Sequence, residues 1–133
     1  MREILLKAKT ISGNWVNGLL ANKDDKWYIS NKAGMPFAYD VRPETLCQFT
    51  GRFDIYGNKI WENDILKTWS GEYAQVKFGF YNTGFEIGNY NQGFYAAFSE
   101  DSYYRHELGY WCKESYVIGN IFDNKELLQE ERR

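Results

Sequence analysis

Residues 44–67 read ETLCQFTGRFDIYGNKIWENDILK and contain the clearest succession of turns and strands in the chain. Residues 50–51 (Thr-Gly) and 56–58 (Tyr-Gly-Asn) are typical of turns, because Gly and Asn tolerate a positive φ. Ile60 and residues 65–66 (Ile-Leu) supply the apolar side chains of a strand. The stretch therefore predicts a β fold, and it carries no recognisable catalytic constellation.

Alternating or apolar stretches separated by Gly, Asn and Ser recur along the rest of the chain. Alternation of apolar and polar side chains is typical of a strand with one buried face. The first thirty residues thus predict a meander. A Ser-Gly turn should close a hairpin in which Val76, Phe78 and Phe80 face one side. Strands are expected at residues 2–10, 27–29, 59–69, 73–80, 94–98 and 114–122.

The connections between these strands are rich in turn-forming and polar residues. Residues 17–18 (Asn-Gly) are typical of either a hairpin turn or a bulge, and both interpretations stay open here. Asp123 or Asn124 should cap a short C-terminal helix. Loops are expected at residues 22–26, 34–43 and 99–106.

Short strands with frequent turns predict a barrel or a sandwich, so we expect an all-β fold. A chain of 133 residues is long enough to bury a core without the help of disulfides or metals, and it is too short for two full-sized domains. We therefore expect a single domain over residues 1–133. A division into two intimately packed β subdomains, at about 1–45 and 46–133, stays open.

The composition limits the classes of function. The chain has 16 Lys and Arg against 18 Asp and Glu, so it lacks the positive charge that non-specific duplex binding requires. Aromatic residues make up 19% of the chain, which is more than a core of this size needs. Some of the rings should therefore lie on a surface.

Cysteine usage and the N-terminus favour the cytoplasm. Cys47 and Cys112 lie far apart in the sequence, with no His or acidic residue at metal-ligand spacing. The opening residues MREILLKAKT carry charges within their apolar run, which is not typical of a signal peptide. We expect reduced thiols, no metal and a cytoplasmic location.

Four ordered blocks of the chain resemble the YopX protein family of phages and prophages. The blocks read REILLKAK, WVNGLL, PETLCQFTGRFDIYGNKIWENDILK and VIGNIFDNKELL. The third is similar to a family pattern of Q-F-T-G, D-x-x-G-x-x-I and E-G-D-I, and the fourth to V-I-G-N-I followed by N-x-x-L-L. The chain departs from the family pattern at Cys47 and Asn63, each of which stands where Gly is usual. Asn tolerates the left-handed conformation nearly as well as Gly does.

The resemblance implies a mainly antiparallel β protein of small barrel-like, SH3-like units that acts inside a bacterial host. It supplies no activity. It assigns a structural role to the matching residues, which are Gln48, Phe49, Thr50, Gly51, Asp54, Gly57, Ile60, Glu62, Asp64, Ile65, Val117, Ile118, Gly119, Asn120 and Ile121.

Asp54, Glu62 and Asp64 are the first candidate for chemistry. Glu62 and Asp64 lie two apart in a predicted strand and would share a face, as the ligands of a divalent cation or an acid and base pair do. A calcium site, however, takes about six to eight oxygen ligands, and the neighbouring sequence does not complete the set. We favour turn capping by Asp54 and a solvated strand face.

His106 is the only histidine, and it forms a conceivable nucleophilic dyad with Cys47 or Cys112. No oxyanion-hole motif accompanies either cysteine. We therefore expect His106 in an exposed loop and Cys112 in the core.

The densest run of aromatic residues lies at 78–110. Rings on a small β protein stack on single-stranded bases or anchor a protein interface. Cations are sparse in this run, which favours a protein partner over nucleic acid. The predicted interaction surface consists of Phe80, Tyr81, Tyr90, Phe94, Tyr95, Tyr103 and Tyr104.

These observations predict a non-enzymatic, oligomeric β protein of a prophage, without cofactor, that binds a host or phage protein. A protein that binds single-stranded nucleic acid is the alternative. A third hypothesis is an enzyme centred on Glu62 and Asp64, which requires a concave pocket and a further base or ligand.

Overall fold

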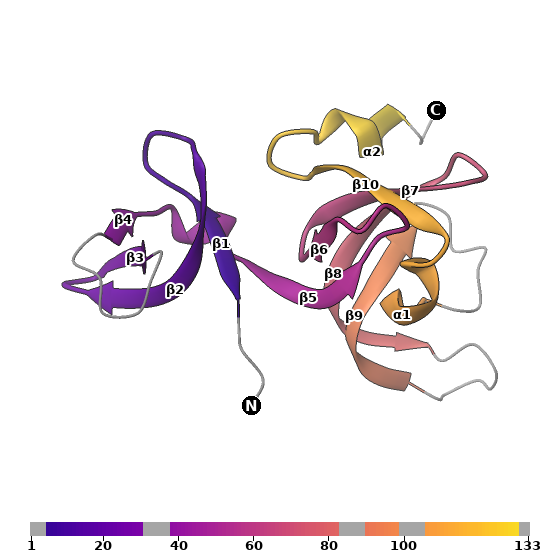
Figure 1. Cartoon of the computed structure of the whole chain (residues 1–133), viewed down its shortest axis with the longest axis horizontal. Helices are drawn as coiled ribbons and strands as arrows, with labels where there is room; N and C mark the ends of the chain where they lie inside the picture. Colours follow the sequence, from indigo (N-terminus) through magenta and orange to yellow (C-terminus); the bar gives the residue numbers. More distant parts are fainter. Residues whose placement is uncertain (1–4, 31–37, 83–89, 99–105, 131–133) are drawn as a thin grey trace. The chain divides into compact units, whose positions relative to one another are not determined.

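The computed structural model describes residues 5–30, 38–82, 90–98 and 106–130, which divide between two compact units. Unit 1 is Met1–Phe49 and unit 2 is Thr50–Arg133. The described residues are mainly antiparallel strands, and their helices are short (Figure 1). The predicted all-β, mainly antiparallel class is therefore confirmed.

Unit 1 is an antiparallel meander. Its strands are β1 (Leu6–Lys9), β2 (Trp15–Lys23), β3 (Lys26–Ser30) and β4 (Ala38–Asp40), and each pairs with the next along the chain. The start of β5 (Cys47–Phe53) pairs with the other side of β1. The predicted meander is thus confirmed. Ala8, Ile29 and Val41 form its buried core.

The connections in unit 1 differ from the expectation at three places. Residues 24 and 25, both Asp, make a two-residue turn between β2 and β3 with φ of 54° and 63°, where a longer charged loop was expected. Both residues need positive φ, which Asp adopts more readily than most. β2 continues through Gly18, so the hairpin turn considered there is wrong. The expected 34–43 loop contains β4, because Tyr39 pairs with Ile29.

A one-turn 3-10 helix, η1 (Pro43–Thr45), precedes β5. The hydroxyl of Thr45 accepts a hydrogen bond from the Lys9 N–H at 2.8 Å and donates one to the Arg42 carbonyl at 2.7 Å. Thr45 therefore ties η1 to β1 in the interior of unit 1.

The turn predicted at Gly51 is wrong, because β5 continues through this residue. Gly51 has a φ of 82°, which an L-residue rarely adopts in a strand, so the glycine is required for a local bend. The second half of β5 neighbours β6 (Lys59–Trp61). The Thr50 hydroxyl donates to the Ile60 carbonyl at 2.6 Å across these strands.

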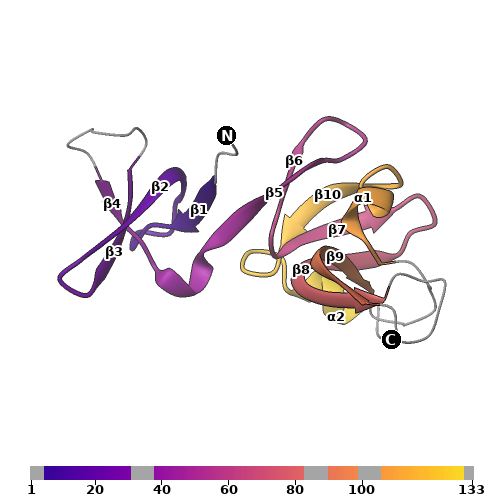
Figure 2. The same ribbon diagram turned by 90° about the horizontal axis from the view of Figure 1, so that it is seen from below.

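Unit 2 contains a four-stranded antiparallel sheet in the order β10-β7-β8-β9 (Figure 2). The strands are β7 (Asp64–Thr68), β8 (Tyr73–Asn82), β9 (Tyr90–Phe98) and β10 (Ser115–Asn120). The predicted hairpin through Ser70 and Gly71 is present as β7–β8. The expected 59–69 strand is wrong, because Asn63 at φ 70° breaks it into β6 and β7.

Both sheets keep two end strands within the described residues, so neither closes into the expected barrel. α2 (Glu126–Glu130) is the predicted C-terminal helix and packs against β8. α1 (Leu108–Trp111), which packs against β9, was not predicted, because four residues make a single turn too short for a periodic signal. In the described parts of the chain, neither helix has the length and hydrophobicity needed to span a membrane.

Two groups of buried side chains form the core of unit 2. Ile60, Leu66, Val76, Leu108 and Cys112 make up the first group. Ala74, Ala96 and Trp111 make up the second. Cys112 is therefore a buried apolar residue, as expected, and its thiol is free.

Candidate functional site

The Asp54 carboxylate is a structural centre of unit 2. Its Oδ1 accepts hydrogen bonds from the backbone N–H groups of Tyr56 and Asn58, both at 2.9 Å. Its Oδ2 accepts from the Val117 N–H at 2.9 Å and from the Asn58 side chain at 3.3 Å. Asp54 therefore holds the Gly57 turn and fastens it to β10.

These contacts also set the ionisation of Asp54. Burial alone raises the pKa of the carboxyl group, because it disfavours the charged form. Hydrogen bonds from the N–H groups of Val117, Asn58 and Tyr56 favour the charged form and outweigh burial. The pKa of Asp54 consequently lies below its ordinary value of 3.8.

Asp64 and Asn63 build a second tight turn. The solvated strand face predicted for Glu62 and Asp64 is wrong, because Glu62 lies between β6 and β7 and Asp64 is buried. The Asp64 Oδ2 accepts from the Trp61 N–H at 2.8 Å. The Asn63 N–H donates to the Val76 carbonyl at 2.7 Å, and its carbonyl accepts from Ile121 at 3.0 Å. Among residues 5–30, 38–82, 90–98 and 106–130, no three His, Cys, Asp or Glu side chains gather where they could hold a metal.

The terminal motif forms a third compact turn. The Asn120 side-chain oxygen accepts from the N–H groups of Phe122 and Asp123, both at 2.9 Å. The Asn124 side-chain oxygen accepts from the Asn120 N–H at 3.2 Å and so stabilises this turn. A Cβ at Gly119 would lie 2.6 Å from the Asn124 Cγ, which explains why glycine is needed at this position.

The predicted interaction surface centres on the β8–β9 hairpin. The two strands pair from Ala74 opposite Phe98 to Asn82 opposite Tyr90. Val76, Phe78 and Phe80 share one face, as the alternation predicted, because successive side chains of a strand point to opposite faces. The cross-strand partners on this face include Phe94, which pairs with Phe78.

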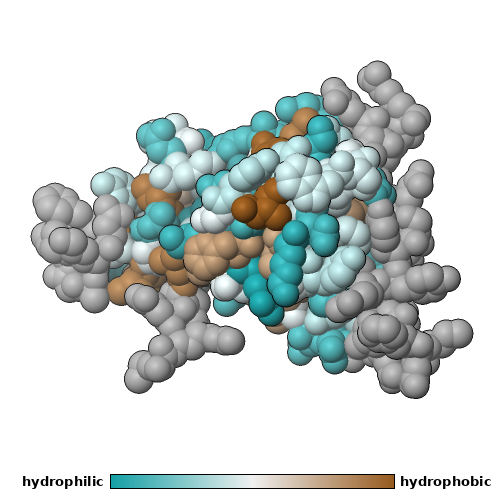
Figure 3. Space-filling model, turned by 45° about the vertical axis from the view of Figure 1, so that its right-hand side comes forward, coloured by the Kyte–Doolittle hydropathy of each residue, from teal (hydrophilic) through white to brown (hydrophobic). Residues whose placement is uncertain are grey.

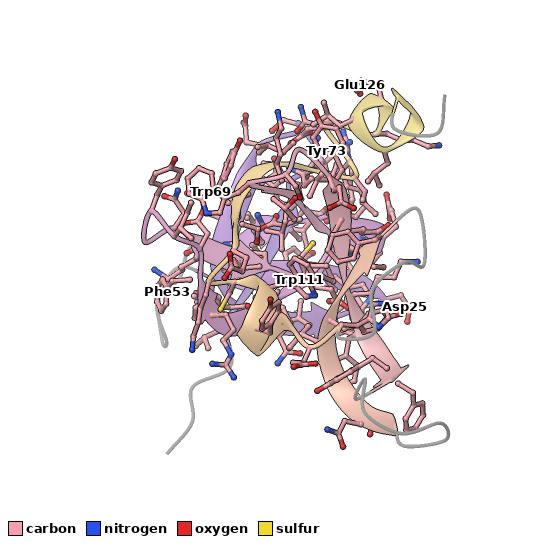
Figure 4. All side chains as sticks on the ribbon, turned by 90° about the vertical axis from the view of Figure 1, so that its right-hand side faces the viewer. Asp25, Phe53, Trp69, Tyr73, Trp111 and Glu126 are labelled. Atoms are coloured by element: carbon pink, nitrogen blue, oxygen red, sulfur yellow. The ribbon has the colours of Figure 1, made fainter. Side chains whose placement is uncertain are left out.

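Only one end of this apolar face is covered. Val76 is 0% exposed, whereas Phe78 is 52% and Phe80 72% exposed. The Phe78 and half-buried Phe94 rings meet edge to face with centroids 5.0 Å apart. Figures 1 and 4 show that end of the hairpin extending beyond the rest of unit 2. We call Phe78, Phe80 and Phe94 the phenyl surface.

The opposite face of the hairpin carries Tyr81 and Tyr95, whose ring centroids lie 5.9 Å apart. The Tyr95 ring lies over Gly79, with its Cε1 3.7 Å from the position of a Cβ there, and Tyr81 lies over Gly93 at the same distance. Rings that cover a cross-strand glycine pair stabilise the hairpin. The predicted surface is thus divided between two faces of one hairpin.

The remaining predicted surface residues are less fully described. Tyr90 pairs through its backbone with Asn82. Tyr103 and Tyr104 lie outside the described residues. Phe78 was missing from the predicted set, although it shares a face with Phe80, because alternation does not reveal where the cover of a strand ends.

The comparison with protein families gives one match. The family model described as YopX protein matches residues 7–129, which is nearly the whole chain. The chain belongs to the YopX protein family. No curated protein matches it. In this YopX chain, several residues of the family-like blocks support turns, among them Asp54, Asp64 and Asn120. The phenyl surface lies outside these blocks.

A second exposed aromatic group of this YopX protein was not predicted. The Tyr116 ring contacts Tyr56, with centroids 5.6 Å apart, and Trp69, at 5.9 Å. Tyr56 is 66% and Trp69 64% exposed, and Figure 4 shows Trp69 at the edge of unit 2. The sequence signal for both is their position beside the Gly57 and Gly71 turns, which lie on surfaces.

The two units differ in charge. Residues 1–49 contain seven Lys and Arg against five Asp and Glu, a net charge of +2. Residues 50–133 contain nine against thirteen, a net charge of −4. On the face shown in Figure 3, hydrophobic residues form small groups among hydrophilic ones. The unit that carries the phenyl surface is therefore the acidic one.

Proposed function

We propose that this YopX protein is a non-enzymatic, oligomeric accessory protein of a phage or prophage that binds a protein partner through the phenyl surface. Its place of action is the cytoplasm of the bacterial host. One observation carries the proposal. Phe78 and Phe80 stand exposed on one face of a hairpin, whereas Val76, farther along the same face, is fully buried.

Exposed phenyl rings of this kind favour association. Full burial of a Phe side chain contributes about 1.5–3 kcal/mol, and phenyl pairs add about 1 kcal/mol when they meet edge to face. Phe78 and Phe94 already meet in that geometry, so the surface is partly preorganised. The net charge of −4 on this unit disfavours nucleic acid as the partner.

The assignment as a non-enzyme is supported by the state of the carboxylates. Asp54 accepts four hydrogen bonds from the turn and from β10, and Asp64 accepts one from Trp61. The lowered pKa of Asp54 keeps it ionised, which makes it a poor proton carrier near neutral pH.

A capture experiment with matched variants tests the proposal. The tagged protein is used to capture partners from a bacterial host lysate, and the captured protein is then purified and its affinity measured. We expect the double variant Phe78→Ser/Phe80→Ser to lose at least about tenfold in affinity, since two anchors are removed. Phe53→Ser is the control, because Phe53 is 49% exposed on β5. Equal loss with both variants, or none with either, contradicts the proposed surface.

Binding of single-stranded nucleic acid is a second candidate, and it is supported at a different place. In unit 1 the Lys7 and Lys9 ammonium groups lie 4.6 and 5.6 Å from the centroid of the Trp15 ring. Cations beside a ring on a β surface are used to bind single strands. If this candidate holds, fluorescence anisotropy with labelled oligothymidine will show binding that weakens with salt and with Lys7→Gln/Lys9→Gln. No binding at low salt removes it.

A further inference from the structure

Among the described residues, the backbone of residues 106–107 is the segment that bonds to the outer edge of β9. β9 is an end strand of its sheet. On the outer side, Tyr95 makes an isolated bridge with Glu107, and the Ala96 N–H donates to the His106 carbonyl at 2.8 Å. Backbone direction alternates along a strand, so Phe94 and Gln92 direct their N–H and C=O groups to the same side as Ala96.

Apart from its contacts with residues 106–107 and α1, β9 also lacks two features that normally protect an edge, namely charge and proline. It reads YNQGFYAAF, nine residues without a charge or a proline. The other described end strands are protected: β4 and β6 have three residues each, and β10 has a register irregularity between Val117 and Gly119. A long, uncharged edge is a template for pairing with another strand.

We propose that residues 90–94 of β9 pair antiparallel with the same residues of a second copy, with the two-fold axis at Gln92. The bridge at Tyr95 and Glu107 limits the pairing to this segment, whose central residue is Gln92. The two four-stranded sheets then join into one. This inference rests on the oligomeric part of the proposed function and gives it a partner and a mode of contact.

The chemistry of the segment favours a second copy as the occupant. In a two-fold pairing every side chain meets itself or a near neighbour, so any charge in the segment would be placed close to its copy. Residues 90–94 carry none. Phe94 shares a face with Phe78 and Phe80, so the pairing extends the phenyl surface across the axis.

Light scattering on the full chain tests the oligomer, with three substitutions at one position. Gln92→Pro removes an outward N–H and leaves the ladder to β8 intact, and Gln92→Lys places two like charges at the axis. Both should be monomers at micromolar concentrations at which the wild type is a dimer. Gln92→Thr keeps the N–H and the neutral side chain, so it should remain a dimer. Circular dichroism spectra establish that each variant is folded.

Cross-linking tests the register. A thiol at position 92 would face its copy across the axis, whereas one at 91 would lie on the other face, displaced diagonally by about 7–8 Å from its copy. Under mild oxidation Gln92→Cys should form a covalent dimer at least about tenfold faster than Asn91→Cys. The native Cys47 and Cys112 are buried, so the wild type should not cross-link.

The outcomes separate this inference from the proposed function. A monomeric wild type, or a dimer that persists in Gln92→Pro and fails to cross-link through position 92, overturns the pairing of two copies. If the wild type is a monomer and Gln92→Pro no longer captures the partner, the edge of β9 pairs with a strand of that partner instead. The phenyl surface is judged independently, by whether Phe78→Ser/Phe80→Ser weakens capture while Phe53→Ser does not.

Discussion

Two regions of unit 2 use their residues in opposite ways. In the motif turns around Asp54, Asn63 and Gly119, side chains and backbone groups bond one another within the unit. At the far end of the β8–β9 hairpin, Phe78 and Phe80 are large, apolar and exposed. The contacts of Asp54, Asn63 and Gly119 therefore serve the fold, and the exposed rings that suggest binding lie elsewhere.

The difference also concerns the carboxylates that the sequence offered as candidates for chemistry. Titratable residues gathered in a concave pocket suggest catalysis. Here Asp54 and Asp64 accept hydrogen bonds from backbone N–H groups of their own turns. Substitutions should therefore affect stability in the first region and binding in the second.

Removal of the Asp54 carboxylate should produce the largest effect. Asp54→Ala leaves the N–H groups of Tyr56, Asn58 and Val117 without their acceptor, and we expect a loss of about 3 kcal/mol in the free energy of unfolding. Urea titration followed by circular dichroism measures the loss. Asp54→Asn, which keeps one acceptor oxygen, should lose less. If Asp54→Ala lowers the free energy of unfolding by less than about 1 kcal/mol, the motif turns would be no more important for stability than the exposed end of the β8–β9 hairpin.

Substitution of Gly119 should rank second. A methyl group there meets the Asn124 side chain, whose Cβ lies 2.9 Å from the added atom, so Gly119→Ala should cost about 2 kcal/mol. Gly79→Ala is the control, because its Cβ would lie 3.7 Å from the nearest atom and should cost less than about 0.5 kcal/mol. Thermal unfolding compares the two. Equal costs would contradict the packing of the terminal motif.

Acid should weaken the fold through Asp54. The folded pKa lies below the ordinary value of 3.8, so the stabilisation is complete above that pH and is lost as the pH falls through the folded pKa. We expect the difference in unfolding free energy between the wild type and Asp54→Asn to be greatest near neutral pH and to shrink below about pH 4. Urea midpoints of both proteins from pH 7 to pH 3 test this. A pH-independent difference would assign the loss to shape instead of charge.

The phenyl surface should give the smallest change in stability. Phe80→Ser removes a ring that is mostly in water, and we expect a change of less than about 0.5 kcal/mol. Val76→Ala, four residues earlier on the same face, should cost about 2 kcal/mol because it leaves a cavity. The pair is compared by thermal unfolding of dilute protein. A large cost for Phe80→Ser would place that ring in the core.

The strand and turn pattern was largely predictable. The alternation in residues 73–80 and the Ser-Gly turn before them identified the β7–β8 hairpin. Gly51 and Gly57 identified positions of positive φ. Gly51 shows the limit: its positive φ was predictable, but its place inside β5 depends on the Thr50 bond to Ile60 on the next strand. Likewise, Asn63 breaks the 59–69 strand through contacts with Val76 and Ile121, which are distant in sequence.

The amino-acid sequence by itself determined the β class, the family, and which side chains of β8 share a face, because glycine spacing and two-residue alternation are local properties of the chain. Only the tertiary structure decided that Val76 is covered and Phe80 is not, and that Asp54 reaches Val117. Alternation specifies the direction of a side chain, whereas its burial depends on what other segments place over it.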